Sequence, residues 1–455
     1  MSFDRRLLLT AGLGITASAA AALAGERRSR PAAAPADRRG AMEPAGLAPD
    51  DTRDQSLALQ AAIDEAAHRG VPLVLPAGTI RAAGIVLRAG TRLIGAHGAT
   101  TLLFAGGPSF LTAEVAPGIT IEDLSIDGGS LALDPAVAEA LLSLAGCSGL
   151  AVRNVAIARS LLNGIALKRC AGAVTGCSIA MVSQAAIAST DAEGLDIVAN
   201  RIAHCGNNGI LVWRERPGED GTLVTGNRIE HVAARAGGSG ENGNGINVFK
   251  AGGVIVSNNR IRDCAYSAVR GNSASNLSIV GNSASRIGEV ALYAEFAFEG
   301  ALIASNLIED AASGIEVTNF NEGGRLAVVQ GNLIRRLKRR EQEPEDKRGD
   351  GIGVEADCVV TGNVIEDAPN AGIVVGWGEY MRNCQVTANL VRNARYGVLV
   401  SSHPAAGACL VSSNMITGAR EGAVRLMDHG LPLGPDLALA PPATGRVSVT
   451  GNVVA

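Results

Sequence analysis

The chain has few aromatic side chains, which make up 3% of its 455 residues, whereas glycine alone supplies 57. This composition excludes a core built on aromatic clusters and predicts many tight turns around a core of Val, Ile, Leu and Ala. Charge of one sign is also scarce, since the formal net charge is −4 and the pI is near 6.0. With no basic stripe interleaved with aromatic residues, nucleic acid is not expected as a partner.

Long apolar runs are confined to the N-terminus, and no other run approaches the roughly 20 residues that a membrane span requires. Residues 1–24 have the pattern of an export signal: Arg5 and Arg6 precede small apolar residues, and an A-x-A motif ends at Ala24. The paired arginines resemble a twin-arginine signal, which implies the Tat translocase as a partner during export. An ordinary secretory signal is the alternative. Both predict a periplasmic or secreted protein without a membrane span after signal removal.

One short phrase, apolar-x-apolar-x-Gly-Asn-x-Ile, is abundant and repeats with a base period near 24 residues. A fixed period of this length indicates stacked units that bury their apolar faces only against their neighbours. Between the first two asparagines, Ser178 is expected to hold the equivalent place. The asparagine recurs at Asn154, Asn200, Asn227, Asn259, Asn282, Asn306, Asn332, Asn363, Asn389, Asn414 and Asn452.

Within each unit the apolar residues alternate with period two, which predicts short strands and leaves no run long enough for a helix. The asparagine lies between two strands, at a corner expected to need a residue that tolerates left-handed backbone. Stacked amides would then hydrogen-bond along a column. We therefore predict an all-β fold, a single right-handed parallel β-helix with three strands per coil and roughly 12 coils, over residues 49–455.

The region before the first coil is predicted to contain a linker and a helix. Residues 25–48, rich in Ala, Pro and Arg, are expected to be a disordered linker. Residues 52–55 are expected to form a capping box for a helix at about 54–69, with Gly70 as its stop. This helix would cap the open end of the solenoid.

Cysteine pairs of the metal-binding Cys-x-x-Cys type are absent among the eight cysteines. Cys358, Cys384 and Cys409 each lie five residues before an asparagine of the repeat. This register indicates stacked inward positions, where cysteine acts as a small hydrophobic residue. A disulfide between Cys384 and Cys409 is the alternative, because strands of adjacent coils lie about 4.8 Å apart.

The opening of the repeat region, residues 50–52 with the helix and residues 74–79 (VLPAGT), resembles pectate-lyase-like β-helix proteins. The whole chain resembles more closely a family of twin-arginine-translocated repeat proteins of bacteria, on the phrases ALYAEF (291–296), TNFNEGG (318–324) and GWG (376–378). These resemblances imply the fold and export rather than a chemistry. The clustered aspartates of pectate lyases, the paired aspartates of polygalacturonases and the Asp-Pro-His phrase of alginate epimerases are absent. We therefore predict no metal and no other cofactor.

Polar and aromatic residues crowd the outward positions of the strands that begin Gly-Ile in the central coils. Aromatic rows suit sugar chains, whose faces are apolar and whose edges carry hydroxyls, so we predict a polysaccharide or oligosaccharide partner. Insertions at 232–244 and 336–350 are expected to rise as walls beside this face, although the second also reads as a solvated loop. The candidate substrate-binding residues are Trp213, Asn247, Phe249, Asn272, Asn319, Glu355 and Trp377.

The candidate catalytic residues on this face are Arg270, Tyr293, Glu295, Glu316 and Lys250, with Tyr293 expected level with Asn272. A lyase or epimerase acting on a uronic acid would use Lys250 as base, Arg270 as carboxylate clamp and Tyr293 as proton donor. A hydrolase would use two carboxylates, such as Glu295 and Glu316 on neighbouring coils. The residues do not decide between these enzymes. A non-catalytic glycan-binding or envelope-associated protein that uses the same aromatic rows is a further alternative.

Overall fold

The computed structural model describes residues 40–238, 240–339, 349–440 and 445–455. The expected export signal, residues 1–24, lies outside the described residues, as does the expected linker up to residue 39. Gly40–Ala455 form one compact unit.

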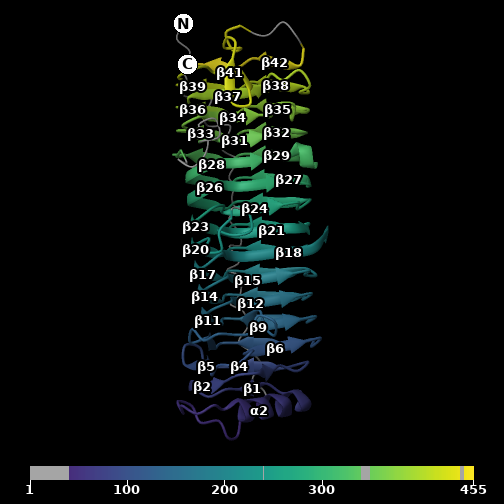
Figure 1. Cartoon of the computed structure of the whole chain (residues 1–455), viewed down its shortest axis with the longest axis vertical. Helices are drawn as coiled ribbons and strands as arrows, with labels where there is room; N and C mark the ends of the chain where they lie inside the picture. The colour runs from purple at the N-terminus through teal and green to yellow at the C-terminus, as the bar shows by residue number, and fades with distance from the viewer. Residues whose placement is uncertain (1–39, 239, 340–348, 441–444) are drawn as a thin grey trace, which may run out of the picture. The chain divides into compact units, whose positions relative to one another are not determined.

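Short parallel strands, three to a coil, stack along one axis in this unit (Figure 1). A representative coil consists of β16 (Leu195–Val198), β17 (Arg201–Cys205) and β18 (Asn208–Glu219). The first strand of each coil belongs to a 15-stranded sheet that runs from β1 (Leu73–Val74) to β42 (Val447–Thr450). The fold is a right-handed parallel β-helix of about 14 turns, as predicted from the repeat. The number of turns is larger than the roughly 12 coils predicted, because the coils before residue 150 lack the Gly-Asn phrase.

The second and third strands of the coils form a single 28-stranded sheet. They join because β26 (Ser283–Glu295) and β28 (Leu307–Val317) run through the corner that separates these two faces in other coils. Inward side chains of successive coils meet in register, as Ile202, Ile229 and Ile261 do, and each is at most 1% exposed. Apolar contact between successive coils therefore forms one continuous core.

The asparagines form the predicted column from Asn200 to Asn452. In each step, one Oδ1 accepts both the backbone N–H and the Nδ2–H of the asparagine in the preceding coil. Asn306 Oδ1, for example, lies 2.8 Å from Asn282 N and 3.1 Å from Asn282 Nδ2. Its own Nδ2 donates to the Ile279 carbonyl at 2.9 Å. Every polar group of these buried amides is thereby satisfied within the stack.

Two details of this corner differ from the prediction. The left-handed residue is the one before the asparagine, for example Gly226 with φ 68°, which explains the Gly-Asn phrase. Asn154 occupies that earlier position, with φ 52°, so it lies outside the column and bonds Asp123 instead. The ladder place below Asn200 belongs to Cys177, whose N–H donates to Asn200 Oδ1 at 2.9 Å, and not to Ser178.

Helix α2 (Ser56–Arg69) packs across the first coil (Figure 1). Its residues Leu59, Ile63 and Ala66 are buried. Gly70, with φ 66°, ends the helix in the left-handed conformation, as expected. The predicted capping box is wrong. The N-cap is Gln55, whose side-chain amide bonds both the N–H and the C=O of Ala48, at 2.8 and 3.0 Å. Gln55 thus ties the incoming chain to the helix rather than capping its first turn.

All eight cysteines lie within the described residues, and each is buried and free. Cys384 and Cys409 are register partners on β35 (Cys384–Thr387) and β38 (Cys409–Ser412), which agrees with the inward stack. Burial raises the pKa of the Cys384 thiol to about 12, so it stays protonated and acts as part of the core.

Candidate functional site

A pocket of about 380 Å³ opens on the face formed by the third strands of the coils. Its floor is built by β26, β28, β31 (Ile352–Val354) and β34 (Ala371–Val375), and the short helix η1 (Phe320–Glu322) lies at its edge. It brings together five of the predicted site residues, Tyr293, Glu316, Asn319, Glu355 and Trp377. The other side chains that matter for its chemistry are Glu289, Asp350 and Tyr380.

The register of the coil that carries Tyr293 differs from the prediction. Tyr293 pairs with Arg270 on one side and Glu316 on the other, while Glu295 pairs with Asn272. From Cys264 to Val269 and from Ile287 to Leu292 the two coils advance by the same number of residues, so Leu292 rather than Val290 is the inward partner of Val269. Tyr293 therefore points into the pocket, two places from where the repeat alone puts it.

Glu316 and Glu355 lie diagonally opposite on adjacent strands. Glu316 pairs with Gly353, and Glu355 follows Gly353 by two residues on the same outward face. Strand spacing of about 4.8 Å and a rise of about 3.3 Å per residue place their Cα atoms roughly 8 Å apart. The Glu316 carboxylate extends over Gly353, where a Cβ atom would lie 1.9 Å from its Oε2. The absence of a side chain at Gly353 thus leaves room for the Glu316 carboxylate over the neighbouring strand.

Burial raises the pKa of the Glu355 carboxyl to about 7, against the opposing effect of backbone hydrogen bonds from Phe320 and Asn319. The Phe320 N–H donates to Glu355 Oε2 at 2.7 Å, which fixes the carboxyl at the edge of the pocket. Burial likewise raises the pKa of Tyr293. A carboxyl with a pKa near 7 is half protonated at neutral pH and can donate or accept a proton there.

Arg270, Glu295 and Glu289 form a buried ion-pair cluster beside Tyr293. Arg270 Nε and Nη2 donate to Glu295 at 2.6 and 2.9 Å, and Arg270 Nη1 donates to Glu289 at 3.1 Å. Burial acts to lower the pKa of Arg270, but its hydrogen bonds to Glu295 outweigh this and raise it. Burial raises the pKa of Glu295 despite those bonds, yet the bidentate geometry indicates a charged pair. The Arg270 guanidinium also lies 4.8 Å from the Tyr293 ring centre, so it supports the pocket wall.

The remaining predicted residues lie in the coils before the pocket and do not line it. Trp213 and Phe249 pack edge to face, with ring centres 5.7 Å apart, and Lys250 Nζ lies 4.6 Å from the Phe249 ring centre. Asn247 accepts from Trp213 Nε1 at 3.2 Å and donates to the Gly240 carbonyl at 2.6 Å. Asn272 donates to Glu295 at 3.2 Å.

The two insertions take different places from those expected. Segment 232–244, described except for residue 239, folds over the face, so that Asn247 and Arg270 are only 2% and 6% exposed. It is a cover rather than a wall. Of segment 336–350, residues 340–348 lie outside the described part, but Asp350 at its end lines the pocket.

The sequence reasoning missed Glu289, Asp350 and Tyr380. Glu289 lines the pocket from the corner before this face, where the register shifts relative to β28, and the repeat pattern does not reveal that place. Tyr380 returns beside Trp377 through a tight turn in which the two residues form an antiparallel bridge. Asp350 directly precedes the Gly-Ile of its coil, and an acidic residue at that place is a sequence signal that could have identified it as a pocket residue.

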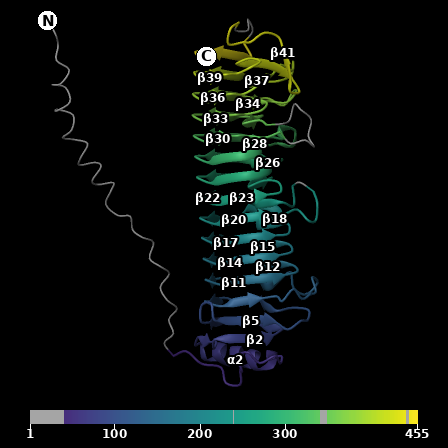
Figure 2. The same cartoon turned by 90° about the vertical axis from the view of Figure 1, so that its left-hand side faces the viewer.

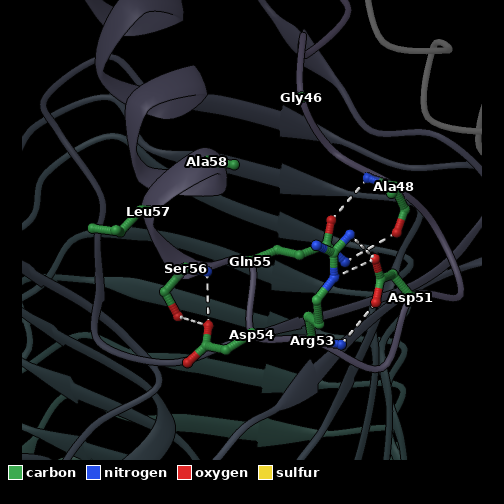
Figure 3. Close-up of a pocket in the computed structure, with 9 residues that line it drawn as sticks. All are labelled: Gly46, Ala48, Asp51, Arg53, Asp54, Gln55, Ser56, Leu57 and Ala58. Atoms are coloured by element: carbon green, nitrogen blue, oxygen red, sulfur yellow. Dashed lines mark hydrogen bonds and ion pairs between the residues drawn. The ribbon is translucent and has the colours of Figure 1, made fainter.

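Another hollow, of about 510 Å³, lies beside the start of α2 (Figure 3). Its polar side chains bond to one another or to nearby backbone groups: Arg53 pairs with Asp51 at 2.5 Å, Asp54 accepts from the Ser56 N–H at 2.8 Å, and Gln55 bonds the backbone of Ala48. These contacts hold the chain at the helix start, so this hollow is structural.

No cluster of three or more metal-ligating side chains occurs within the described residues. Over the same residues, no helix has both the length and the apolar character for crossing a bilayer.

The stacked coils define the fold as a right-handed parallel β-helix, and residues 217–416 match the family model described as right handed beta helix region. A comparison with curated proteins gives no match.

Among solved structures, the chain is similar to the N-terminal fragment of bacteriophage Phi29 gene product 12, with 16% identity and a TM-score of 0.54. The match covers 90% of this chain and 70% of that one. It is also similar to the catalytic unit of a GH87 alpha-1,3-glucanase from Streptomyces thermodiastaticus strain HF3-3, with 14% identity, a TM-score of 0.49 and coverage of 91% and 69%. A third similar structure is an exopolygalacturonase from Thermotoga maritima, with 14% identity, a TM-score of 0.44 and coverage of 91% of both chains. At these identities the likeness concerns the fold.

Proposed function

We propose that this protein is a polysaccharide-active hydrolase that cleaves glycosidic bonds of an uncharged sugar chain in the pocket on its third face. The observation that carries this proposal is the pair formed by Glu316 and Glu355 in one pocket, with the pKa of Glu355 raised to about 7 by burial. Glycoside hydrolysis uses two carboxyl groups with different protonation states.

Glu355 takes the role of general acid. At neutral pH its carboxyl is available in the protonated form and transfers that proton to the oxygen of the departing sugar as the glycosidic bond breaks. Glu316, extended over Gly353, takes the second role. It either removes a proton from the attacking water or forms the bond to the anomeric carbon that water then hydrolyses.

Aromatic and amide side chains around the pair suit a sugar. Trp377 and Tyr380 offer ring surface for an apolar sugar face, and Asn319 and Asn321 offer amide groups for hydroxyls. Trp377 is held edge to face against His429, with ring centres 5.7 Å apart, so its orientation is fixed before substrate arrives.

The charge of the pocket favours an uncharged substrate over a uronic acid. Its lining includes four carboxyl groups, Glu289, Glu316, Asp350 and Glu355, and no lysine or arginine of the described residues. Arg270 is already engaged by Glu295 and Glu289, and Lys250 lies on Phe249, so neither supports the clamp-and-base pair of a lyase or epimerase. A substrate carboxylate would meet repulsion here.

The test is a screen of purified protein against neutral polysaccharides, following reducing ends, with acidic polysaccharides and absorbance of unsaturated ends in parallel. Glu355→Gln and Glu316→Gln should each lower kcat by about 10²- to 10⁴-fold while leaving substrate binding within a few-fold. Release of unsaturated ends would instead identify a lyase. The second candidate, a non-catalytic glycan-binding protein, rests on the same aromatic rings. It would be identified by glycan binding that Trp377→Ala abolishes and that no release of sugar accompanies.

Export to the periplasm or medium through the Tat translocase forms part of this proposal and rests on the paired arginines of the N-terminal segment. Arg5→Lys with Arg6→Lys should retain the full-length chain in the cytoplasmic fraction. Unchanged export would point to the ordinary secretory route.

A further inference from the structure

An unpaired arginine stripe lies on a different face from the pocket, along the second strands of the coils. Arg201, Arg228 and Arg260 begin the successive strands β17, β20 (Arg228–Val232) and β23 (Arg260–Cys264), which lie one above another (Figure 2). The three residues are direct register partners. All three side chains are exposed.

No carboxylate of the described residues neutralises the positive charge of these arginines. Among the described residues, none of the three has an ion pair or a side-chain hydrogen bond. Other charged residues of this face do pair, as Arg262 does with Glu230 and Arg286 with Asp263. Like charges directly opposite one another on neighbouring strands are destabilising. A stripe of three therefore lowers stability unless an anion lies along it.

The surface around the stripe is hollowed. A depression of about 250 Å³ is lined by the three arginines and by the small side chains Ser178, Ala180 and Ala203. Arg262 and Glu230 also line it, but they pair with each other, so the depression keeps an excess of three positive charges. The small side chains leave room for a chain to lie close to the guanidinium groups.

We infer that this depression binds a linear acidic polysaccharide, laid along the axis of the coils with its anionic groups against Arg201, Arg228 and Arg260. The guanidinium groups repeat at the strand spacing of about 4.8 Å, so they match a polymer that carries about one anionic group per sugar. No aromatic side chain lines the depression to stack on bases, which disfavours single-stranded nucleic acid. The stripe is separate from the pocket and holds a chain of different charge from the proposed substrate. It would therefore anchor the protein to an acidic glycan rather than cleave it.

The experiment measures binding of fluorescently labelled polygalacturonate, a carboxylated chain, and of dextran sulfate, a sulfated chain, at low ionic strength. Uncharged dextran and a single-stranded oligonucleotide serve as comparison ligands. The wild type should bind at least one acidic glycan, with affinity that falls as salt rises. Arg201→Ala with Arg228→Ala and Arg260→Ala should weaken that binding by roughly tenfold or more, the sum of three surface ion pairs.

The control variant removes the same charge elsewhere, through Arg216→Ala, Arg235→Ala and Arg420→Ala, three exposed arginines away from the stripe. It should bind as the wild type does, and so should Glu355→Gln, which separates this surface from the pocket. Three results would overturn the inference: no binding of either acidic glycan, an equal loss in the control variant, or tighter binding of the oligonucleotide through the same arginines. The stripe variant should melt no lower than the wild type, so a loss of binding would not reflect unfolding.

Discussion

Replacing Glu355 with glutamine tests the environment of the proposed general acid without requiring a substrate. Glutamine keeps the size of the side chain and an oxygen that can accept the Phe320 N–H, so the edge of the pocket should keep its shape. It removes only the ionisation. In the wild type, the folded protein holds the Glu355 proton up to a pKa of about 7, whereas the unfolded chain releases it near the ordinary glutamate pKa of 4.5.

The sign of the effect follows from these two values. Between pH 4.5 and 7 the folded state binds more protons than the unfolded state, so this group makes the free energy of unfolding fall as pH rises. At 1.36 kcal/mol per pKa unit, the loss amounts to about 3 kcal/mol by pH 8, as an upper bound for a side chain that is not fully enclosed. Glu355→Gln lacks this loss. It should therefore gain up to about 3 kcal/mol over the wild type at pH 8 relative to pH 4.5.

The measurement is urea denaturation of both proteins at pH 4.5, 6 and 8, followed by circular dichroism. Glu193→Gln, an exposed glutamate, is the matched control and should show no such pH-dependent difference. If the difference between Glu355→Gln and the wild type is the same at pH 4.5 and pH 8, the carboxyl is not held protonated by burial. The assignment of Glu355 as the acid would then fail. If it holds, the activity of the wild type should decline as pH rises through about 7, because the acid loses its proton.

Further predictions concern the stack and the core. Asn306→Ala removes the acceptor of two Asn282 donors and the donor to the Ile279 carbonyl, so it should lower the free energy of unfolding by about 3 kcal/mol or more. Asn452→Ala, at the partly exposed end of the ladder, should lower it by about 1 kcal/mol. Equal losses for the two variants in urea denaturation would contradict the ladder. Arg270→Ala leaves Glu295 buried without its cation and should lower the free energy of unfolding by about 3–5 kcal/mol. The double variant Arg270→Met with Glu295→Gln should recover part of that loss. A loss below about 1 kcal/mol for Arg270→Ala would show that the pair is not buried. The eight cysteines should react with a thiol reagent at neutral pH only after denaturation, and rapid reaction of any of them in the native protein would contradict their burial.

The repeat made the fold predictable because one physical rule is applied again in every coil. Period-two alternation and a buried amide at a fixed place determine which side chains face inward, and the ladder from Asn200 onward follows from the spacing alone. The pattern failed at Asn154, where the same residue type serves a different need, a left-handed backbone one position earlier. Identical letters in a repeat do not distinguish a hydrogen-bonding role from a conformational one.

The site was less predictable because it depends on departures from the repeat. Tyr293 lies in line with Arg270 and Glu316 because Leu292, and not Val290, is the inward residue level with Val269 and Ile315, and no local composition signal marks this register. The cover over Asn247 comes from an insertion whose path the period does not specify. Reading outward columns found five residues of the pocket. It also grouped with them the Trp213 and Phe249 pair, which lies in earlier coils and packs on itself.

Gly353 has a consequence for how such a scaffold acquires new activities. Because its missing side chain is what lets the Glu316 carboxylate extend across to the neighbouring strand, a single added methyl group at residue 353 would push that carboxylate away while every inward contact of the coil stayed intact. The chemistry of this face is thus decoupled from the architecture that carries it. A substitution at this outward position would therefore displace the carboxylate of the proposed site without changing an inward residue of the coil.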